Sequence, residues 1–126
     1  MTISASQTNL PDGRMSKWKW SALGTTVVGS TIGDWVGFSD FADRTVMVTG
    51  TFGTGCALTW QGSLNGNTSD AVPFTLHNPA ITALTSTLAG GNTVLEAAEY
   101  IRPIISTAST LATSIDAYLF GRKNPI

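Results

Sequence analysis

The stretch that decides the fold covers residues 45–52 and reads TVMVTGTF. Apolar and polar side chains alternate along it, so that Val46, Val48 and Phe52 point to one side and Met47 and the threonines to the other. A period of two residues is typical of a β-strand with one face in a core. This stretch therefore predicts a strand of a β-sheet.

A second run with the same period covers residues 56–64. Trp60 lies on its apolar side, where we expect core residues. The glycine-rich segment at residues 53–55 separates the two runs, and such a segment is typical of a tight turn. We therefore predict that the two strands form a hairpin.

Further strands follow from the same pattern. Pro73 marks the strand predicted at residues 72–76 as an edge strand, because proline has no N–H to donate to a sheet. Segments rich in Gly, Asn, Ser and Pro predict loops or turns at residues 65–70, 78–79 and 90–92. The additional predicted strands cover residues 17–20, 25–28, 72–76, 81–88 and 111–120.

The segment of residues 93–105 is ambiguous. Some of its apolar residues recur at a helical spacing, but Pro103 disfavours a helix at the residue before it. We expect a helical turn at Glu96–Glu99, followed by a strand. About seven short strands separated by turns predict an all-β protein, an antiparallel β-sandwich of jelly-roll type.

The first residues of the chain differ from the rest. Residues 1–16 are polar and show no periodicity, so we predict an extended N-terminal arm followed by a β-sandwich domain over residues 17–126. Such an arm either orders on a neighbouring subunit or stays loose, and both alternatives remain open. The start lacks the basic flank and apolar stretch of a signal peptide, and no run of about 18 apolar residues predicts a membrane span.

The composition is poor in charge. Only 12% of the residues are charged, about half of the usual fraction of roughly 25%. The chain contains 19 Thr and 12 Ser instead, and its net charge is −1. No basic stripe is present, so nucleic acid is not an expected partner. A surface with so little charge predicts that part of it is covered by other protein in the working state.

The search for catalytic or metal-binding patterns predicts no enzyme and no cofactor. His77 is the only histidine and Cys56 the only cysteine, whereas a zinc site with such ligands needs three or four. No serine elbow or phosphate-binding glycine loop is present. We expect His77 to be a solvated loop residue, and the single cysteine excludes an internal disulfide.

Three aspartates fall close together, at Asp34, Asp40 and Asp43. A loop that gathered them would suit Ca²⁺, but their spacing differs from the known calcium loop and aspartates of this kind are common in turns. Glu96 and Glu99 are expected to pair with Arg102 rather than to form a catalytic carboxylate pair.

Four residues are the candidates for a partner interface: Trp18, Trp20, Trp35 and Arg102. Tryptophan and arginine are enriched at the energetic centres of protein interfaces. Each of them has an alternative structural role, the tryptophans as core residues and Arg102 as a cation satisfied within the fold.

Several motifs resemble a family of small structural proteins of tailed bacteriophages. Residues 46–53, VMVTGTFG, match the family pattern V-x-V-x-G-T-F-G, and residues 100–103, YIRP, match Y-I-R-P. Residues 58–66, LTWQGSLNG, are similar to the family's V-T-hydrophobic-x-G-S-N-D-G, with Leu64-Asn65-Gly66 in place of N-D-G. Asn78 replaces the aspartate of the family's D-P-x-G turn. The resemblance covers about residues 44–123.

This resemblance implies a virion component, a capsid decoration or cement protein that sits as a trimer on the outer shell. Its expected partner is the major capsid protein, its expected site of assembly is the host cytoplasm, and neither catalysis nor a cofactor, nucleic acid or membrane is implied. One alternative is a carbohydrate-binding or host-adhesion module with exposed aromatic residues. Another is a tail or head-completion protein of the virion.

Overall fold

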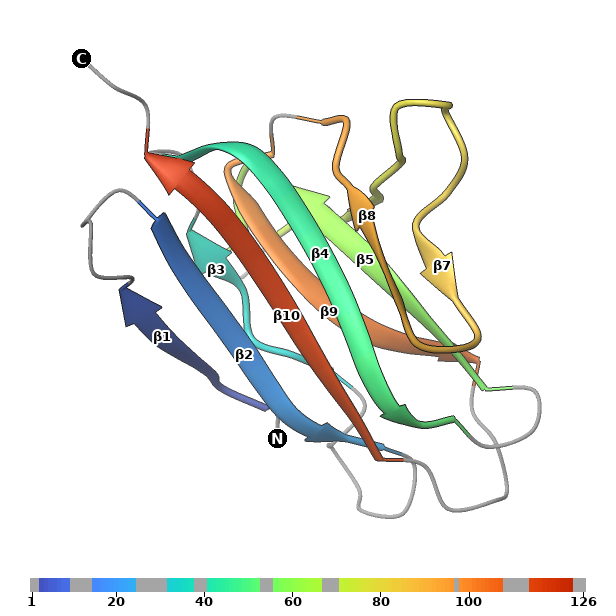
Figure 1. Ribbon diagram of the computed structural model, residues 1–126. Coiled ribbons are helices and arrows are strands. Elements are labelled where there is room, and N and C mark those ends of the chain that lie inside the picture. The colour runs from blue at the N-terminus through green and yellow to red at the C-terminus, as the bar shows by residue number, and fades with distance from the viewer. Residues whose placement is uncertain are drawn as a thin grey trace.

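The computed structural model (Figure 1) describes residues 3–9, 15–24, 32–37, 41–52, 56–66, 71–96, 98–107 and 114–123. These ranges form strands and no helix, which confirms the predicted all-β class. The strands are β1 (Ala5–Asn9), β2 (Met15–Leu23), β3 (Val36–Gly37), β4 (Phe41–Thr51), β5 (Ala57–Ser63), β6 (Phe74–Thr75), β7 (Thr85–Ser86), β8 (Gly90–Thr93), β9 (Tyr100–Thr107) and β10 (Ser114–Lys123). No helix long and apolar enough to cross a lipid bilayer occurs within these ranges.

The strands form two antiparallel sheets that face each other (Figure 1). The front sheet of Figure 1 has the order β1-β2-β10-β4-β8, and the rear sheet has the order β3-β9-β5-β6, with β7 also paired to β5. The predicted antiparallel sandwich is therefore present. Figure 1 shows β7 and β8 on the same side of the molecule, opposite to β1.

The core lies between the sheets and is built from alternate residues of their strands. Trp20 of β2 meets Trp60 of β5 edge to face, with ring centroids 5.7 Å apart. Val46 and Val48 are buried, as the alternation in residues 45–52 predicts. Each large apolar side chain that is buried in this way contributes about 1.5–3 kcal/mol. The core also contains Leu23, Leu58, Leu76, Ile101, Ile115, Ala117 and Leu119.

The predicted hairpin between residues 45–52 and 56–64 is wrong. Both strands exist, but β4 pairs with β10 and β8, whereas β5 pairs with β9, β6 and β7. The chain thus crosses from one sheet to the other between them, and Val48 and Trp60 enter the core from opposite sides. Alternation tells which face of a strand is buried, but it does not tell which strand lies beside it. The predicted turn at residues 53–55 lies outside the described residues.

Gly50 fits β4 closely against β10. Its φ angle is +118°, which L side chains rarely adopt, and a β-carbon there would lie 2.3 Å from the carbonyl oxygen of Ser114. Glycine alone combines this backbone conformation with so close an approach. Gly50, the first of the two glycines in the VMVTGTFG motif, is therefore a requirement of the fold.

The predicted N-terminal arm is partly a strand of the sandwich. Residues 5–9 form β1, which pairs with β2 along its whole length at the edge of the front sheet. The N–H of Ile3 donates to the carbonyl of Ile32 at 2.8 Å, which ties the strand's start to the chain before β3. The described part of residues 1–16 therefore belongs to the protein's own fold. An edge strand buries little side-chain surface, so its sequence needs no apolar alternation.

Other local predictions are corrected by the structure. The predicted turn at residues 90–92 is part of β8, and of the predicted strand at residues 81–88 only Thr85–Ser86 is a strand. Glu96, Ala98 and Glu99 are not helical, so the predicted helical turn is wrong. The predicted strand at residues 25–28 lies outside the described residues.

Pro73 and Pro103 lie where the sequence predicts them to lie, Pro73 at an edge strand and Pro103 in a segment that is not helical. Pro73 immediately precedes β6, the edge strand of the rear sheet, as predicted. Pro103 lies inside β9, where its carbonyl accepts a hydrogen bond from Gly33 at 2.9 Å. Because the nitrogen and the carbonyl of one residue point to the same side of a strand, the missing N–H of Pro103 faces residue 33 and leaves the pairing with β5 intact.

Candidate protein-binding surfaces

Trp18 and Trp20 of β2 point into the sandwich. Trp20 is 0% exposed and Trp18 is 6% exposed, and the Nε1–H of Trp20 donates to the carbonyl of Asp34 at 3.0 Å. Both rings are thus used by the protein's own core. This burial does not fit the predicted role of the two tryptophans at a partner interface.

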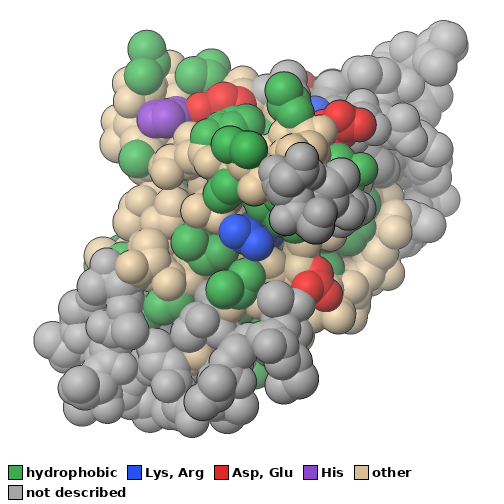
Figure 2. Space-filling model, turned by 180° about the vertical axis from the view of Figure 1, so that it is seen from behind, with side chains coloured by type: hydrophobic (Ala, Val, Ile, Leu, Met, Phe, Trp, Pro, Cys, Tyr) green, Lys and Arg blue, Asp and Glu red, His purple; other side chains and the backbone are tan. Residues whose placement is uncertain are grey.

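Trp35 and Arg102, the other two predicted interface residues, form one cluster on the outer face of the rear sheet. The guanidinium carbon of Arg102 lies 4.3 Å from the centroid of the Trp35 ring. Its Nε–H donates to Oε1 of Gln61 at 3.0 Å, across the β5–β9 pairing. Figure 2 shows this side of the molecule, where hydrophobic side chains gather around a cationic one.

The expected pairing of Arg102 with Glu96 or Glu99 is wrong. Glu96 contacts His77 instead, and no ion pair joins Arg102 to a carboxylate of the described residues. Burial lowers the pKa of the Arg102 guanidinium, although arginine keeps its charge at every physiological pH. Arg102 is therefore a partly buried cation that is held by an aromatic ring and an amide.

A groove of about 440 Å³ between β1 and β3 brings Trp18 and Trp35 together. Ser4 lies at this groove and donates a hydrogen bond to Oδ2 of Asp34 at 3.0 Å. Since Trp18 is almost wholly buried and Arg102 covers one face of Trp35, the groove presents little free aromatic surface. A carbohydrate-binding site built on Trp18, Trp20 and Trp35 is poorly supported by this geometry.

The three aspartates considered for calcium do not meet in the described part of the chain. Asp34 interacts with Ser4, and Asp43 pairs with Arg122, while Asp40 lies outside the described residues. The described residues contain no group of three or more His, Cys, Asp or Glu side chains suited to a metal ion.

His77 and Glu96 form a tight pair at the side of the sandwich. The backbone N–H of His77 donates to one carboxylate oxygen of Glu96 at 2.7 Å, and the ring Nδ1 lies 2.6 Å from the other. Burial raises the pKa of the Glu96 carboxyl, but the hydrogen bonds from His77 outweigh that effect and hold the pKa below its ordinary value. His77 lies outside the named strands, as predicted for a loop residue, and its side chain is 35% exposed. It is nevertheless held by Glu96, so that it fastens the chain before β7 to the chain after β8.

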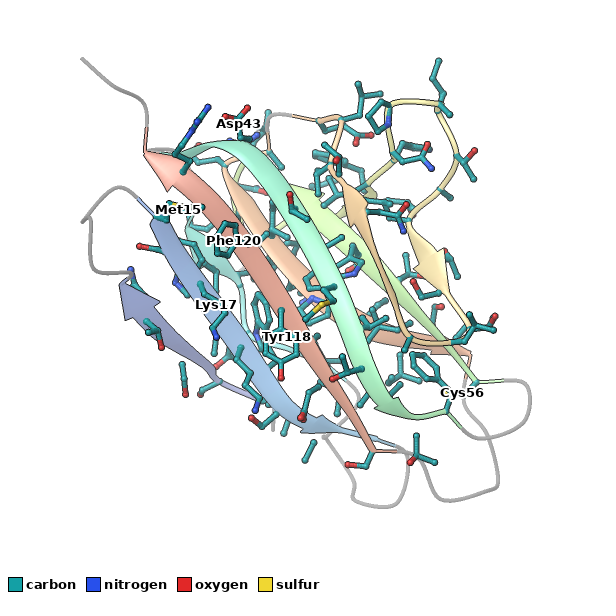
Figure 3. All side chains as sticks on the ribbon, viewed as in Figure 1. Met15, Lys17, Asp43, Cys56, Tyr118 and Phe120 are labelled. Carbon is teal, nitrogen blue, oxygen red and sulfur yellow. The ribbon has the colours of Figure 1, made fainter. Side chains whose placement is uncertain are left out.

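The outer face of the front sheet carries aromatic side chains that the sequence analysis did not select. Tyr118 and Phe120 of β10 lie in its centre, and Figure 3 shows them beside Lys17 of β2. The register places Phe120 between Lys17 and Thr45, and Tyr118 between Lys19 and Met47. A shallow hollow of about 180 Å³ is lined by Lys17, Thr45, Met47, Tyr118 and Phe120. We call these five residues the aromatic face.

Two lysines line one side of the aromatic face. The Nζ atoms of Lys17 and Lys19 lie 5.8 and 5.5 Å from the centroid of the Tyr118 ring. Lys19 also forms an ion pair with Asp116 at 3.7 Å, and interactions with Tyr118 and Asp116 raise its pKa. Met47 on the other side is 42% exposed. The face thus joins exposed apolar surface to a cationic margin.

A second apolar surface lies where both sheets end, at β6, β7 and β8. Between Thr45 and Leu95 the sequence contains one residue of the Asp, Glu, Lys and Arg types, Asp70. We call residues 71–95 the uncharged edge. Interface centres are depleted of charge, and extended exposed apolar surface is unusual on a monomer. The exposed large hydrophobic side chains of the uncharged edge are Val72, Phe74, Ile81, Leu88 and Leu95.

Ile81, one of these residues, is exposed on a tight loop. Ile81 is 75% exposed and has a φ angle of +62°, which is a rare conformation for a β-branched residue. The side-chain oxygen of Asn78 accepts hydrogen bonds from the N–H groups of Ala80 and Thr82, each at 3.0 Å. Asn78 therefore fixes a strained loop that presents an apolar tip.

No protein-family model matches this sequence, and no curated protein matches it. Solved structures with a related arrangement include the SPBc2 prophage-derived protein YomS, at TM-score 0.46 and 10% identity over 85% of this chain and 95% of that chain. A cleaved adhesin domain of Lys-gingipain from Porphyromonas gingivalis gives TM-score 0.41 and 14% identity over 98% of this chain and 85% of that chain. A protein of Bacillus endospore appendages gives TM-score 0.41 and 10% identity, over 97% and 91%. Likenesses at this level do not identify a function.

Proposed function

We propose that this protein is a structural component of a bacteriophage virion, a decoration or cement protein that binds the major capsid lattice on the outer surface of the shell. In this role it has no catalytic activity and needs no cofactor. The sequence motifs shared with small phage structural proteins support the proposal. They lie in β4, in β5 and at the start of β9, which are inner strands of the two sheets.

A jelly roll is the architecture that we propose for the sandwich. The strand order supports it: β2, β10, β4 and β8 are neighbours in one sheet, and β3, β9, β5 and β6 in the other. Between β2 and β10 the chain crosses from sheet to sheet at every connection except those among β5, β6 and β7. Two nested Greek keys give this order, and jelly rolls are frequent in viral capsid proteins and lectins.

The uncharged edge is the observation that carries the functional proposal. Its exposed hydrophobic side chains, with no charge of the Asp, Glu, Lys or Arg type over residues 71–95, suit a surface that is buried against protein. A surface without charges meets a second copy of itself without electrostatic repulsion. We therefore propose that the uncharged edges of neighbouring copies form the subunit contacts of a trimer.

The aromatic face is the proposed contact with the capsid lattice. Tyr118 and Phe120 supply rigid apolar surface, and Lys17 supplies a cation at its margin. Repetition over a symmetric shell multiplies the strength of each such contact, so a modest interface is enough to stabilise the particle.

Rebinding to particles tests the lattice contact. Particles from which the protein has been removed should regain heat resistance when wild-type protein is added. A Tyr118→Ser/Phe120→Ser double variant should bind at least about tenfold more weakly, since aromatic anchors dominate interfaces. Ser114→Ala changes an exposed residue of the same strand and serves as the matched control. Rebinding of the double variant at wild-type strength refutes this lattice contact, and failure of the wild-type protein to rebind refutes the function.

The oligomeric state tests the uncharged edge separately. Light scattering after size-exclusion chromatography should give three times the chain mass for the wild-type protein. Leu88→Lys places a charge at a residue that is 71% exposed and should yield monomers. Ser21→Lys adds the same charge to an exposed site on β2 and should remain trimeric. A wild-type monomer at micromolar concentration is incompatible with the proposed subunit contact.

Copy number separates the decoration protein from a tail or head-completion protein of the same fold. Hundreds of copies for each particle fit decoration, whereas a handful fit a tail or head-completion role. Binding to a glycan array would favour the adhesion module instead.

A further inference from the structure

Arg102 has more hydrogen-bonding capacity than the described residues use. A guanidinium carries five N–H donors in a fixed plane, and the contact to Gln61 engages Nε alone. No carboxylate of the described residues lies within ion-pair distance of Arg102. A partly buried cation in this situation has lost some water without gaining an anion, which is costly.

The position of the guanidinium is fixed before any partner arrives. The guanidinium carbon lies over the Trp35 ring, 4.3 Å from its centroid, and Gln61 holds Nε at 3.0 Å, so two separate contacts restrict the movement of the group. Gly66 packs against the same indole, since a β-carbon there would lie 2.8 Å from Cδ2 of Trp35. Preorganisation of this kind lowers the entropy that a side chain loses on binding.

We propose that Arg102 is a binding site for a carboxylate, supplied by an acidic side chain of a capsid-lattice subunit that contacts the outer face of the rear sheet, a second contact on the side of the sandwich opposite to the aromatic face. The planar fork of arginine matches a carboxylate with two parallel hydrogen bonds. The proposal rests on the proposed function for the identity of the neighbour. The binding of a carboxylate to Arg102 can, however, be tested on the isolated protein.

The surroundings of Arg102 favour a protein ligand. Tyr100 and Ile104 lie two residues to either side of it on β9 and on the same face of the strand, and both are partly buried. Apolar neighbours exclude water from a docked ion pair and so strengthen it. A polyanion such as nucleic acid is recognised by several cations in a row, whereas β9 carries Arg102 as its one basic residue.

The site can be tested first without any particle. Sodium acetate is the probe, and the ¹⁵N signals of the arginine side chains report its binding at an ionic strength held constant with sodium chloride. The Nε signal of Arg102 should shift progressively with acetate. Arg122, which already pairs with Asp43, is the internal control and should shift less. Equal shifts for both arginines, or none, overturn the inference.

Rebinding to stripped particles then tests the protein source of the carboxylate. Arg102→Gln removes the charge, and Arg102→Lys keeps the charge but loses the fork; each should weaken rebinding by at least about tenfold. Gln61→Ala frees the guanidinium from its hydrogen bond and should give an intermediate loss. Arg122→Gln is the matched control and should stay within about twofold of wild type. Circular dichroism must show that each variant is folded.

The possible outcomes separate the two proposals. If wild-type protein rebinds and both Arg102 variants rebind equally well, the inference is wrong and the decoration function stands. If wild-type protein does not rebind at all, the decoration function is wrong, and the acetate titration alone decides whether Arg102 receives a carboxylate. Retention of wild-type affinity by Arg102→Lys together with loss in Arg102→Gln would show that a simple charge suffices and would overturn the bidentate site.

Discussion

Trp20 and Trp60 join the two sheets at the centre of the sandwich, with their rings 5.7 Å apart and inclined by 70°. Each comes from a strand of a different sheet, and both are essentially inaccessible to solvent. The edge-to-face arrangement is a favourable one for aromatic rings. This pair therefore forms a direct contact between the two layers.

We predict that Trp60→Ala lowers the free energy of unfolding by about 3–5 kcal/mol, because it removes a large buried ring and leaves a cavity between the sheets. Trp60→Phe keeps part of the ring contact and should lower the free energy of unfolding by less than Trp60→Ala does. Urea unfolding followed by circular dichroism measures both. A loss below about 1 kcal/mol for Trp60→Ala would show that the sheets do not rely on this contact.

A second prediction compares two glycines. Gly50→Ala should destabilise the protein by more than about 2 kcal/mol, because its positive φ and the carbonyl of Ser114 leave no room for a methyl group. Gly90 has no heavy atom within 4 Å of the β-carbon position and no unusual φ. Gly90→Ala should therefore be neutral or stabilise by about 0.4–1 kcal/mol, through the unfolded state. Equal unfolding midpoints in urea for the two variants would contradict the close approach at Gly50.

The sequence predicts the buried faces better than the partners of each strand. Val46, Val48 and Trp60 alternate with polar residues, and all three are buried as predicted. Alternation carries no information about strand order, so a glycine-rich turn suggested a hairpin where the chain in fact changes sheets. The same limit applies to residues 90–93, where Gly90 and Gly91 read as a turn but pair with β4 as an edge strand.

The candidate surfaces were only partly visible in the sequence. The enrichment of tryptophan at interfaces favours Trp18 as an interface residue, yet Trp18 belongs to the core. The useful signal is on the other face, because Met47 lies at a position predicted to point outward, where a solvated sheet carries polar residues. Tyr118 is the cross-strand partner of Met47. The lack of Asp, Glu, Lys and Arg over residues 71–95 is a second signal, and it identifies the uncharged edge.

A third prediction concerns Ile81. In the Leu88→Lys background, which is expected to be monomeric, Ile81→Gly should leave the stability unchanged or raise it by up to about 1 kcal/mol, because it relieves a positive φ and removes a side chain that buries little surface in the single chain. Ile81→Val keeps the β-branched side chain and should not raise the stability. Thermal unfolding at equal concentration measures both variants. A clear loss of stability for Ile81→Gly in this monomeric background would contradict the strain at Ile81, whereas a loss in the trimeric wild-type background alone is expected if Ile81 lies within the contact between copies.

The pair of His77 and Glu96 gives a prediction about pH. Since the folded state holds the pKa of Glu96 below its ordinary value of about 4.3, ionised Glu96 adds stability above that pH, and the gain disappears as the pH falls through the lower, folded-state pKa. Glu96→Gln should therefore be less stable than wild type at neutral pH, by no more than about 1 kcal/mol for a pair at the surface. Urea midpoints measured from pH 7 to pH 3 should converge in the acid range.

Glu99→Gln is the matched control, because Glu99 is exposed and forms no ion pair with another described residue. If the urea midpoints of wild type and Glu96→Gln differ by the same amount down to pH 3, the carboxylate charge contributes nothing to the contact with His77. That contact would then depend on shape and neutral hydrogen bonds alone.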